Sequence, residues 1–310
     1  MDDIVDLMPA GIITLADARR VGLDPRRLYA AERRGALARV RPGAFVRATV
    51  WAGMTPEERH VVRVRAAATT LHDPVFSHES AAAAWGMPLL GDVADVHIAR
   101  PRARGGSSWS GVVQHESVDE PKAVRHGGVL VTPVVDTVLD LAATRPFAAA
   151  VVVADHALRS GLVAADRLVA AATERQRRRG GRRALVVARF ADPRAESPGE
   201  SLSRARIHEL GLPAPALQRR LRDRDGVIGR VDFWWSSLRL VGEFDGRLKY
   251  RAGGGVDDPR PPEERVWAEK LREDRLRAAG ARVARWTWAD ALDRDRLAAV
   301  LRRGGLYRSA

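Results

Sequence analysis

The stretch from Gly229 to Tyr250, GRVDFWWSSLRLVGEFDGRLKY, decides how the last third of the chain folds. Two apolar runs flank its Ser-Ser pair, which predicts two neighbouring strands. Asp232 falls inside the first run, and Glu243 and Asp245 fall inside the second. Because side chains alternate along a strand, we expect Glu243 and Asp245 to point to the same face.

Carboxylates inside apolar strands indicate a metal site, because a buried charge is costly unless it is paired or binds a cation. Hard divalent cations such as Mg²⁺ or Mn²⁺ prefer oxygen ligands. Glu200, at the start of the preceding helix, offers a fourth carboxylate. We therefore expect a metal site at Glu200, Asp232, Glu243 and Asp245. The alternative is an ordinary strand edge with solvated carboxylates.

The surrounding sequence predicts the element order α-β-β-β-α-β-α. The expected helices and strands are 200–210, 218–222, 228–235, 238–245, 263–279, 283–288 and 290–302. A Pro- and Gly-rich loop, ADPRAESPG, precedes them and marks the predicted boundary of a C-terminal domain at residues 191–310.

Residues 197–300 resemble the very-short-patch-repair (Vsr-like) endonucleases and related DUF559 proteins of the PD-(D/E)XK superfamily. The resemblance is carried by VDF…LRLVGEFDG and by KLREDRLRAAGARVARWTWADAL. It implies a restriction-endonuclease-like sheet flanked by helices and Mg²⁺-dependent hydrolysis of nucleic-acid phosphodiesters. By position, it implies that Asp232 is the first acidic ligand, that Glu243 and Asp245 lie on the second ligand strand, and that Glu200 is the helix-borne Glu.

This stretch departs from the superfamily pattern at the position two residues after the second acid. That position usually holds Lys, and here it is Asp245. Lys249, just beyond the Asp-Gly pair, could supply the missing cation, orienting water or stabilising developing charge. An intact but inactive nuclease fold is therefore the alternative.

The first block of the chain shows a helix, a tight turn, a second helix and a hairpin. Thr14 is expected to cap the first helix, and Asp24-Pro25 to open a second helix that Gly35 ends. Two short alternating runs flank Arg41-Pro42-Gly43, which predicts a hairpin. This order is typical of a winged helix-turn-helix domain, expected over residues 1–54.

The same stretch, ITLADARRVGLDPRRLYAAERRGALARVRPGAFV, resembles the N-terminal domain of AbiEi-type antitoxins of type IV toxin–antitoxin systems. FSHESAAAAWGMPLL and LVTPVVDTVLDLA resemble the region that follows it. The resemblance implies DNA as a partner and a nucleotidyltransferase-type toxin as another. It makes 25–34 the recognition helix, and the implied DNA contacts are Arg26, Arg27, Arg33, Arg34, Arg39, Arg41 and Arg47. A winged helix used only for protein contact is the alternative.

The middle block, residues 55–190, predicts a mixed α/β module. Its expected helices are 55–71, 80–85, 132–143 and 145–160, and its expected strands are 93–99, 112–115 and 128–132. Ser77, His78 and Glu79 are sequence neighbours and therefore do not predict a catalytic triad. The run QRRRGGRR at 176–183 predicts solvated helix ends, with a nucleic-acid contact as the alternative.

Composition limits the chemistry. The chain has 310 residues, 52 Lys+Arg against 39 Asp+Glu, and no cysteine, which excludes disulfides, thiolate metal sites and a cysteine nucleophile. Nearly all basic residues are arginine and asparagine is absent, so part of the excess charge of +13 reflects codon bias. No secretory signal or membrane span is expected, which favours the cytoplasm.

Two functions therefore compete. The leading expectation is a DNA-binding protein whose C-terminal domain is a Mg²⁺-dependent endonuclease. The alternative is a non-enzymatic antitoxin or transcriptional regulator that carries a retired nuclease fold. A structural adaptor without nucleic-acid affinity is a third possibility, and the sequence assigns no oligomeric state.

Overall fold

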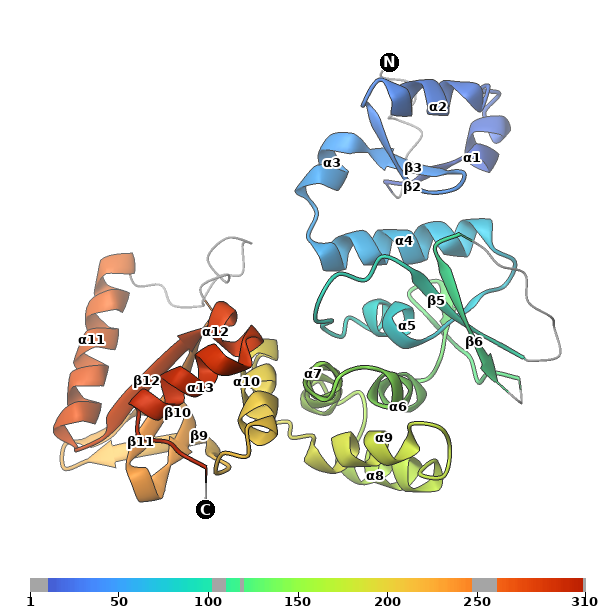
Figure 1. The fold of residues 1–310 in the computed structure, drawn as a ribbon. Helices are drawn as coiled ribbons and strands as arrows, with labels where there is room; N and C mark the ends of the chain where they lie inside the picture. Colours follow the sequence, from blue (N-terminus) through green and yellow to red (C-terminus); the bar gives the residue numbers. More distant parts are fainter. Residues whose placement is uncertain (1–10, 102–109, 118–119, 247–260, 309–310) are drawn as a thin grey trace. The chain divides into compact units, whose positions relative to one another are not determined.

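The computed structural model describes residues 11–101, 110–117, 120–246 and 261–308, and its contacts divide the chain into two compact units. Unit 1 comprises residues 1–145 and 163–188, and unit 2 comprises residues 146–162 and 189–310. Helices alternate with strands of three sheets in the described part (Figure 1), which confirms the mixed α/β, multidomain class.

Unit 1 begins with two short helices and a small antiparallel sheet of order β1-β3-β2. The elements are β1 (Ile13–Thr14), α1 (Leu15–Arg20), α2 (Arg26–Arg33), β2 (Leu37–Arg41) and β3 (Ala44–Arg47). Thr14 caps α1 as expected: its hydroxyl accepts from the Asp17 backbone N–H at 3.1 Å, and Asp17 accepts from the Thr14 N–H at 3.0 Å. Asp24 accepts from the Arg26 N–H at 2.9 Å, and α2 begins at Arg26 with Pro25 as its N-cap residue, one position later than expected.

The next part of unit 1 is a five-stranded mixed sheet of order β6-β5-β4-β8-β7. Its strands are β4 (Val75–Phe76), β5 (Val96–Pro101), β6 (Val112–Ser117), β7 (Val124–His126) and β8 (Val129–Val131). The sequence does not reveal β4 and β7, because strands of two and three residues are too short to show alternation. Phe76, Ile98 and Val131 form the core of the sheet with residues of the neighbouring helices.

Six further helices belong wholly or mainly to unit 1. They are α3 (Ala48–Gly53), α4 (Pro56–Thr70), α5 (His78–Ala84), α6 (Val134–Thr144), α8 (Ala165–Glu174) and α9 (Gly181–Phe190), whose last two residues belong to unit 2. Thr55 caps α4 in the same way that Thr14 caps α1, with Glu58 as its partner.

Helix α7 (Phe147–Arg159) groups with unit 2, although it lies inside the stretch expected to form the middle module. The reason is a buried ion pair: Arg204 on α10 (Pro198–Glu209) donates to both oxygens of Asp155 at 2.7 and 2.8 Å. Asp155 is fully buried and also accepts from the Asp192 N–H at 2.8 Å. Breaking a buried ion pair strongly destabilises a protein, so this pair holds α7 against α10.

Unit 2 contains a four-stranded sheet of order β12-β11-β10-β9. Its strands are β9 (Ala216–Asp223), β10 (Gly226–Trp235), β11 (Leu240–Asp245) and β12 (Arg282–Thr287), and a short 3-10 turn, Ser236–Leu238, joins β10 to β11. Neighbouring strands are antiparallel except β11 and β12, which are parallel. The observed order of helices and strands matches the expected one.

Helices cover both faces of this sheet. Helix α11 (Pro262–Ala278) packs on one face, where Leu276 joins Val231 and Val241 in a buried cluster. Helix α10 packs on the other face, where the Trp286 indole N–H donates to the Ser203 hydroxyl at 2.7 Å. The α12 and α13 helices contact α10.

One expected helix is wrong in detail. Residues 290–302 were expected to form a single helix, but the structure has α12 (Trp288–Leu292) and α13 (Arg294–Arg303). Asp293 separates them, because its carboxylate accepts from the Asp295 and Arg296 N–H groups and so caps α13.

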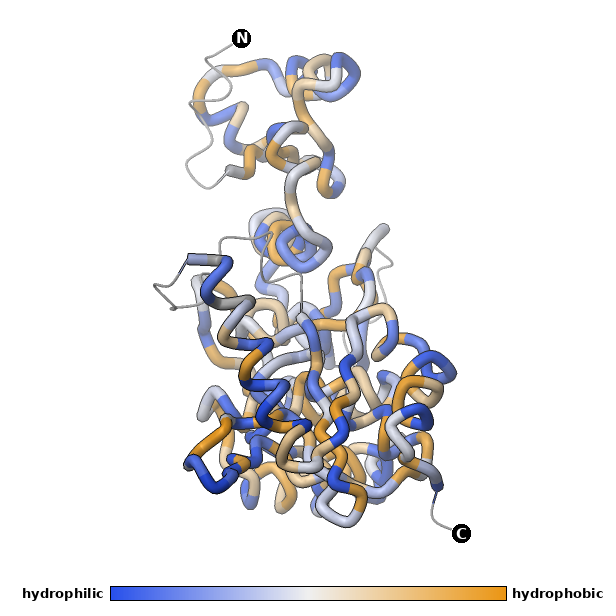
Figure 2. The backbone as a smooth tube through the Cα atoms, turned by 90° about the vertical axis from the view of Figure 1, so that its left-hand side faces the viewer, coloured by the Kyte–Doolittle hydropathy of each residue, from blue (hydrophilic) through white to orange (hydrophobic). Residues whose placement is uncertain are grey.

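Polar and apolar residues alternate over short distances along the described backbone (Figure 2). Among the helices of the described ranges, none is long and apolar enough to cross a bilayer.

Candidate functional site

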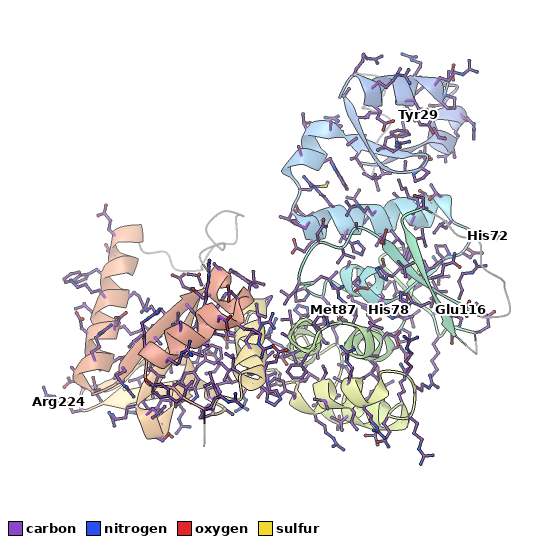
Figure 3. The ribbon with its side chains drawn as sticks, viewed as in Figure 1. Tyr29, His72, His78, Met87, Glu116 and Arg224 are labelled. Carbon is purple, nitrogen blue, oxygen red and sulfur yellow. The ribbon has the colours of Figure 1, made fainter. Side chains whose placement is uncertain are left out.

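The second helix of the winged-helix region has one apolar face and one arginine face. Leu28 and Ala31 are buried in a core with Ile13 and Phe45, and the Tyr29 ring meets Phe45 edge-to-face at 5.3 Å. Tyr29 is labelled in Figure 3. The arginines share one side of the helix, because residues seven apart return to the same side after two turns. This spacing pairs Arg26 with Arg33 and Arg27 with Arg34.

All four of these arginines are exposed. Within the described part of the chain, none of their guanidinium groups makes a hydrogen bond or an ion pair. Four unpaired cations on one side of a helix create a positive surface suited to a polyanion. The four arginines are thus accessible, and their contact with DNA stays a prediction.

The hairpin that follows carries the other three predicted arginines, in different environments. Arg39 and Arg47 are exposed, and Arg39 also pairs with Glu32 of α2 at 3.1 Å. Arg41 is half-buried, and burial lowers the pKa of its guanidinium. Its Nε atom has no hydrogen-bond partner. Arg39 therefore fixes the hairpin to α2, while Arg47 is free to meet a ligand.

A row of polar side chains crosses the sheet of unit 2 where β10 and β11 separate. Gln218 of β9 lies between two residues paired to β10, which places it opposite Asp232. Asp232 accepts from the Phe244 N–H of β11 at 2.9 Å, and Glu243 of β11 is paired in register with Arg285 of β12. The Gln218 amide donates to Glu200 at 2.8 Å and lies 3.5 Å from Asp232.

Asp232 is the most perturbed carboxyl group of this row. Burial, and then the nearby Glu200 carboxylate, raise its pKa to about 6, and Glu243 adds to the effect. Such a shift is typical of acidic groups that share one site without a full set of cations. Glu200 and Glu243 are therefore close enough to Asp232 to disfavour its ionisation.

Glu200 is held by its own helix. Its two carboxylate oxygens accept from the Ser197 hydroxyl at 2.8 Å and from the Glu196 N–H at 2.9 Å, in addition to Gln218. The Ser197 hydroxyl in turn accepts from the Glu200 N–H at 3.2 Å. These reciprocal hydrogen bonds cap the N-terminus of α10, so the Glu200 carboxylate is engaged in helix capping.

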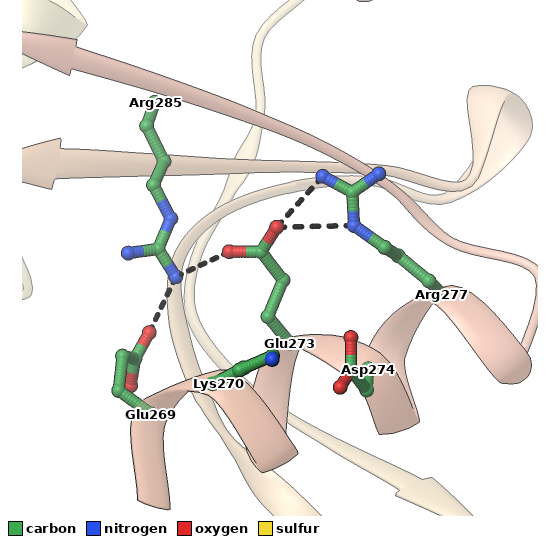
Figure 4. Close-up of a pocket in the computed structure, with 6 residues that line it drawn as sticks. All are labelled: Glu269, Lys270, Glu273, Asp274, Arg277 and Arg285. Carbon is green, nitrogen blue, oxygen red and sulfur yellow. Dashed lines mark hydrogen bonds and ion pairs between the residues drawn. The ribbon is translucent and has the colours of Figure 1, made fainter. Parts of the chain in front are cut away.

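Glu243 is neutralised by arginines. One oxygen lies 2.5 Å from an Arg272 nitrogen of α11, and the other lies 3.2 Å from Arg285. Glu269 of α11 pairs with both of these arginines. Glu273 of α11 pairs with Arg285 and Arg277. Figure 4 shows the Arg285 side of this network at a pocket lined by Glu269, Lys270, Glu273, Asp274, Arg277 and Arg285.

The remaining predicted residues lie at the end of the row. Asp245 is the last residue of β11, half-buried and paired in register with Thr287. Lys249 lies outside the described residues. Sequence reasoning missed Gln218, Arg272 and Arg285, because only the fold reveals that residues so distant in the chain meet the acids.

Glu200 and Glu243, two of the predicted metal ligands, are engaged by partners within the protein. Among the described residues, no group of three or more His, Asp and Glu side chains could hold a metal ion. The physical cause is visible at each acid, since Glu200 is engaged in helix capping and Glu243 is turned to two guanidinium groups. The four-carboxylate Mg²⁺ centre therefore stays a prediction.

Unit 1 holds a second polar cluster, formed by residues of α5, β5 and β6 and by Arg145. His78, labelled in Figure 3, begins α5 with a left-handed φ of 47°. Its ring stacks on that of His115 with the centroids 3.5 Å apart. Glu79 pairs with His97 at 3.3 Å and with Arg145 at 3.1 Å. Burial lowers the pKa of His78 to about 3 and that of His115 to about 4. His78 is buried, as expected of a structural residue.

Comparison with known proteins connects the arginine-bearing helix to a family. Residues 9–48 match the family model described as transcriptional regulator, AbiEi antitoxin. The chain is also 32% identical over 221 residues to "Uncharacterized protein Rv2248" of Mycobacterium tuberculosis strain H37Rv and, equally, to "Uncharacterized protein MT2308" of strain CDC 1551 / Oshkosh. Each alignment covers 69% of this chain and 78% of the relative.

The chain belongs to the family of these mycobacterial proteins. The N-terminal domain is of the AbiEi antitoxin type, which confirms the family resemblance of the stretch ITLADARRVGLDPRRLYAAERRGALARVRPGAFV. The alignment to the mycobacterial family members is much longer than the AbiEi match. The Vsr-like assignment of the C-terminal domain stays a prediction.

Proposed function

We propose that this protein is a DNA-binding transcriptional regulator of the AbiEi antitoxin type. One observation carries the proposal: the AbiEi-type domain exposes four unpaired arginines on one side of its second helix. A helix of this kind places its side chains at base edges and phosphates of the major groove. Arg47 on the hairpin would add a contact to the phosphate backbone.

DNase footprinting of the DNA upstream of the protein's own gene tests this proposal. We expect one protected operator, because antitoxin-type regulators of this design act on their own promoter. The variant Arg26→Gln/Arg27→Gln/Arg33→Gln/Arg34→Gln should lose the protected region, since each lost base contact costs about 1–3 kcal/mol. A footprint that the variant retains in full would contradict the assignment of α2.

The proposal includes a protein partner of the antitoxin, a nucleotidyltransferase-type toxin. The match of residues 9–48 to an antitoxin model supports a toxin partner, and the nucleotidyltransferase type rests on the family resemblance alone. Co-expression of the full chain with a nucleotidyltransferase encoded beside it should relieve the growth arrest that this enzyme causes alone. Arrest that persists despite equal expression of both proteins would argue against an antitoxin role.

We propose a Mg²⁺-dependent endonuclease activity of unit 2 as the second candidate function. The observation that favours it is the raised pKa of Asp232 beside Glu200 and Glu243, which a bound cation would reverse. Glu200, Asp232, Glu243 and Asp245 are the proposed ligands, and Lys249 the proposed cation at the reacting phosphate. The observation that weighs against it is the pairing of Glu243 with Arg272 and Arg285.

Incubation of supercoiled plasmid and single-stranded DNA with Mg²⁺ or Mn²⁺, with EDTA as the control, tests the second candidate. The nuclease predicts cleavage that Asp232→Ala abolishes while DNA binding is retained. Intact DNA in every reaction, or cleavage unchanged in Asp232→Ala, would eliminate it and leave the regulator.

A further inference from the structure

The turn between α8 and α9 carries the densest positive charge of the chain. This segment, residues 175–183 with the sequence RQRRRGGRR, is called the arginine turn below. It lies in unit 1 and outside the winged-helix region (Figure 1), so the proposed function does not yet use it. Six arginines fall within it, and no acidic residue does.

The backbone of the arginine turn is fixed. The N–H groups of Arg178, Gly181 and Ala184 donate to carbonyls three or four residues earlier at 2.9, 2.9 and 3.0 Å. Gly180 has a φ of +73°, and a Cβ there would lie 2.6 Å from the Ala143 carbonyl oxygen of α6. A Cβ on Gly181 would overlap the Arg175 carbonyl. Gly180 is therefore needed for the turn to lie this close to α6, and Gly181 for the turn to close on itself.

Two of the six arginines anchor the turn to α6 and the residue that follows it. Arg175 pairs with Asp136 and lies 3.6 Å from Asp140, and the Arg183 guanidinium donates to the Arg145 carbonyl at 2.6 Å. These contacts use the available acids of the neighbouring helix. These contacts anchor the turn, and its other arginines are exposed outward to solvent.

Three of the outward arginines have no partner among the described residues. Arg177, Arg178, Arg179 and Arg182 are exposed. Of these, Arg177, Arg179 and Arg182 make no hydrogen bond or ion pair within the described ranges. Like charges held close together on a fixed backbone repel one another, and a bound polyanion relieves that repulsion. Because the turn is already ordered, little backbone entropy is lost on binding.

We propose that the arginine turn binds the phosphate backbone of duplex DNA, as a contact surface additional to the winged helix. Guanidinium groups match phosphate oxygens in pairs, and contacts of this kind add affinity without reading the sequence. The choice of duplex DNA among polyanions rests on the proposed function. The arginine turn should therefore bind operator and unrelated duplexes alike.

The test compares two triple variants of the full chain that remove the same charge. Arg177→Gln/Arg179→Gln/Arg182→Gln removes the three unpartnered arginines of the turn. Arg65→Gln/Arg125→Gln/Arg167→Gln removes three exposed arginines spread over α4, β7 and α8. The dissociation constant for an unrelated duplex is measured as salt rises from about 50 to about 200 mM.

Each phosphate contact contributes about 0.9 to the slope of log affinity against log salt, so the turn variant should lower the slope by about 2.7. Over this salt range the affinity of the unaltered protein should fall about 40-fold more than that of the turn variant. The dispersed variant should change the slope by less than about 1. Equal slopes for the two variants would overturn the proposal. It would also be overturned if the arginine turn contributed as much to the binding of polyglutamate as to the binding of the duplex.

Separate outcomes identify failure of the proposed function. A footprint that is lost in the α2 variant, together with a normal salt slope in the turn variant, would refute only the arginine turn. A reduced slope in the turn variant, without any operator preference in the unaltered protein, would support the turn and refute the regulator. Absence of duplex binding by the unaltered protein at about 50 mM salt would refute both.

Discussion

Asp232 retains its proton at a pH where an ordinary aspartate has lost it. Its pKa is raised from 3.8 to about 6, with burial as the first cause and Glu200 as the second. A folded-state pKa above the unfolded one means that the native state loses stability as pH rises between about 4 and 6. The difference corresponds to roughly 3 kcal/mol at neutral pH.

Asp232→Asn should therefore stabilise the protein at about pH 7.5 by up to roughly 3 kcal/mol and leave it nearly unchanged at about pH 4. The amide imitates the protonated acid and still accepts from the Phe244 N–H. Urea unfolding at both pH values measures the effect. Asp225→Asn, at an exposed turn, is the matched control and should change stability by less than about 0.5 kcal/mol. Equal destabilisation of Asp232→Asn at both pH values would contradict this account.

At the same scale, the sequence indicated which acids lie on neighbouring strands but not what would neutralise them. Alternation along one strand was enough to place Glu243 and Asp245 on a common face. The partner of Glu243 is Arg272, which comes from a helix far along the chain. Nothing in the local pattern of that helix distinguishes Arg272 from its many arginine neighbours, so a metal site was the natural expectation.

Elements with local signals were predictable, and elements without them were not. The caps Thr14 and Asp24 act within three residues of themselves, and the sequence predicted both. The break at Asp293 was missed because a capping aspartate between two short helices also fits the surface of one longer helix. Strands β4 and β7 were missed because pairing with their neighbours, and not an internal pattern, defines them.

The α8–α9 turn gives a prediction at the scale of one element. Gly180→Ala introduces a Cβ at a left-handed φ and also into contact with Ala143, whereas Gly161→Ala meets the same φ with open space around it. In both variants the left-handed φ should lower the free energy of unfolding by about 1–2 kcal/mol. In Gly180→Ala the contact with Ala143 should lower it by at least about 1 kcal/mol more. Thermal unfolding compares them, and equal losses would show that the turn does not press on α6.

At the scale of the whole molecule, unit 1 carries arginine surfaces and unit 2 carries a row of acids. Unit 1 combines an AbiEi-type helix with exposed arginines and a rigid arginine turn, both suited to phosphate. Unit 2 has helices on both faces of its sheet and an acid row whose Glu243 is already neutralised by arginines. The class of fold was predictable from element order, but the grouping of α7 with unit 2 was not, because it depends on the Asp155–Arg204 pair.

The most direct test of the central claim is the affinity of the full chain for its own upstream duplex relative to a scrambled duplex, at one salt concentration. The unaltered protein should prefer the upstream duplex by about a thousand-fold or more, as specific regulators do. The variant Arg26→Gln/Arg27→Gln/Arg33→Gln/Arg34→Gln should bind both duplexes alike, while the dispersed arginine variant keeps the preference. A preference that survives loss of these four arginines, or an unaltered protein that shows none, would contradict the claim.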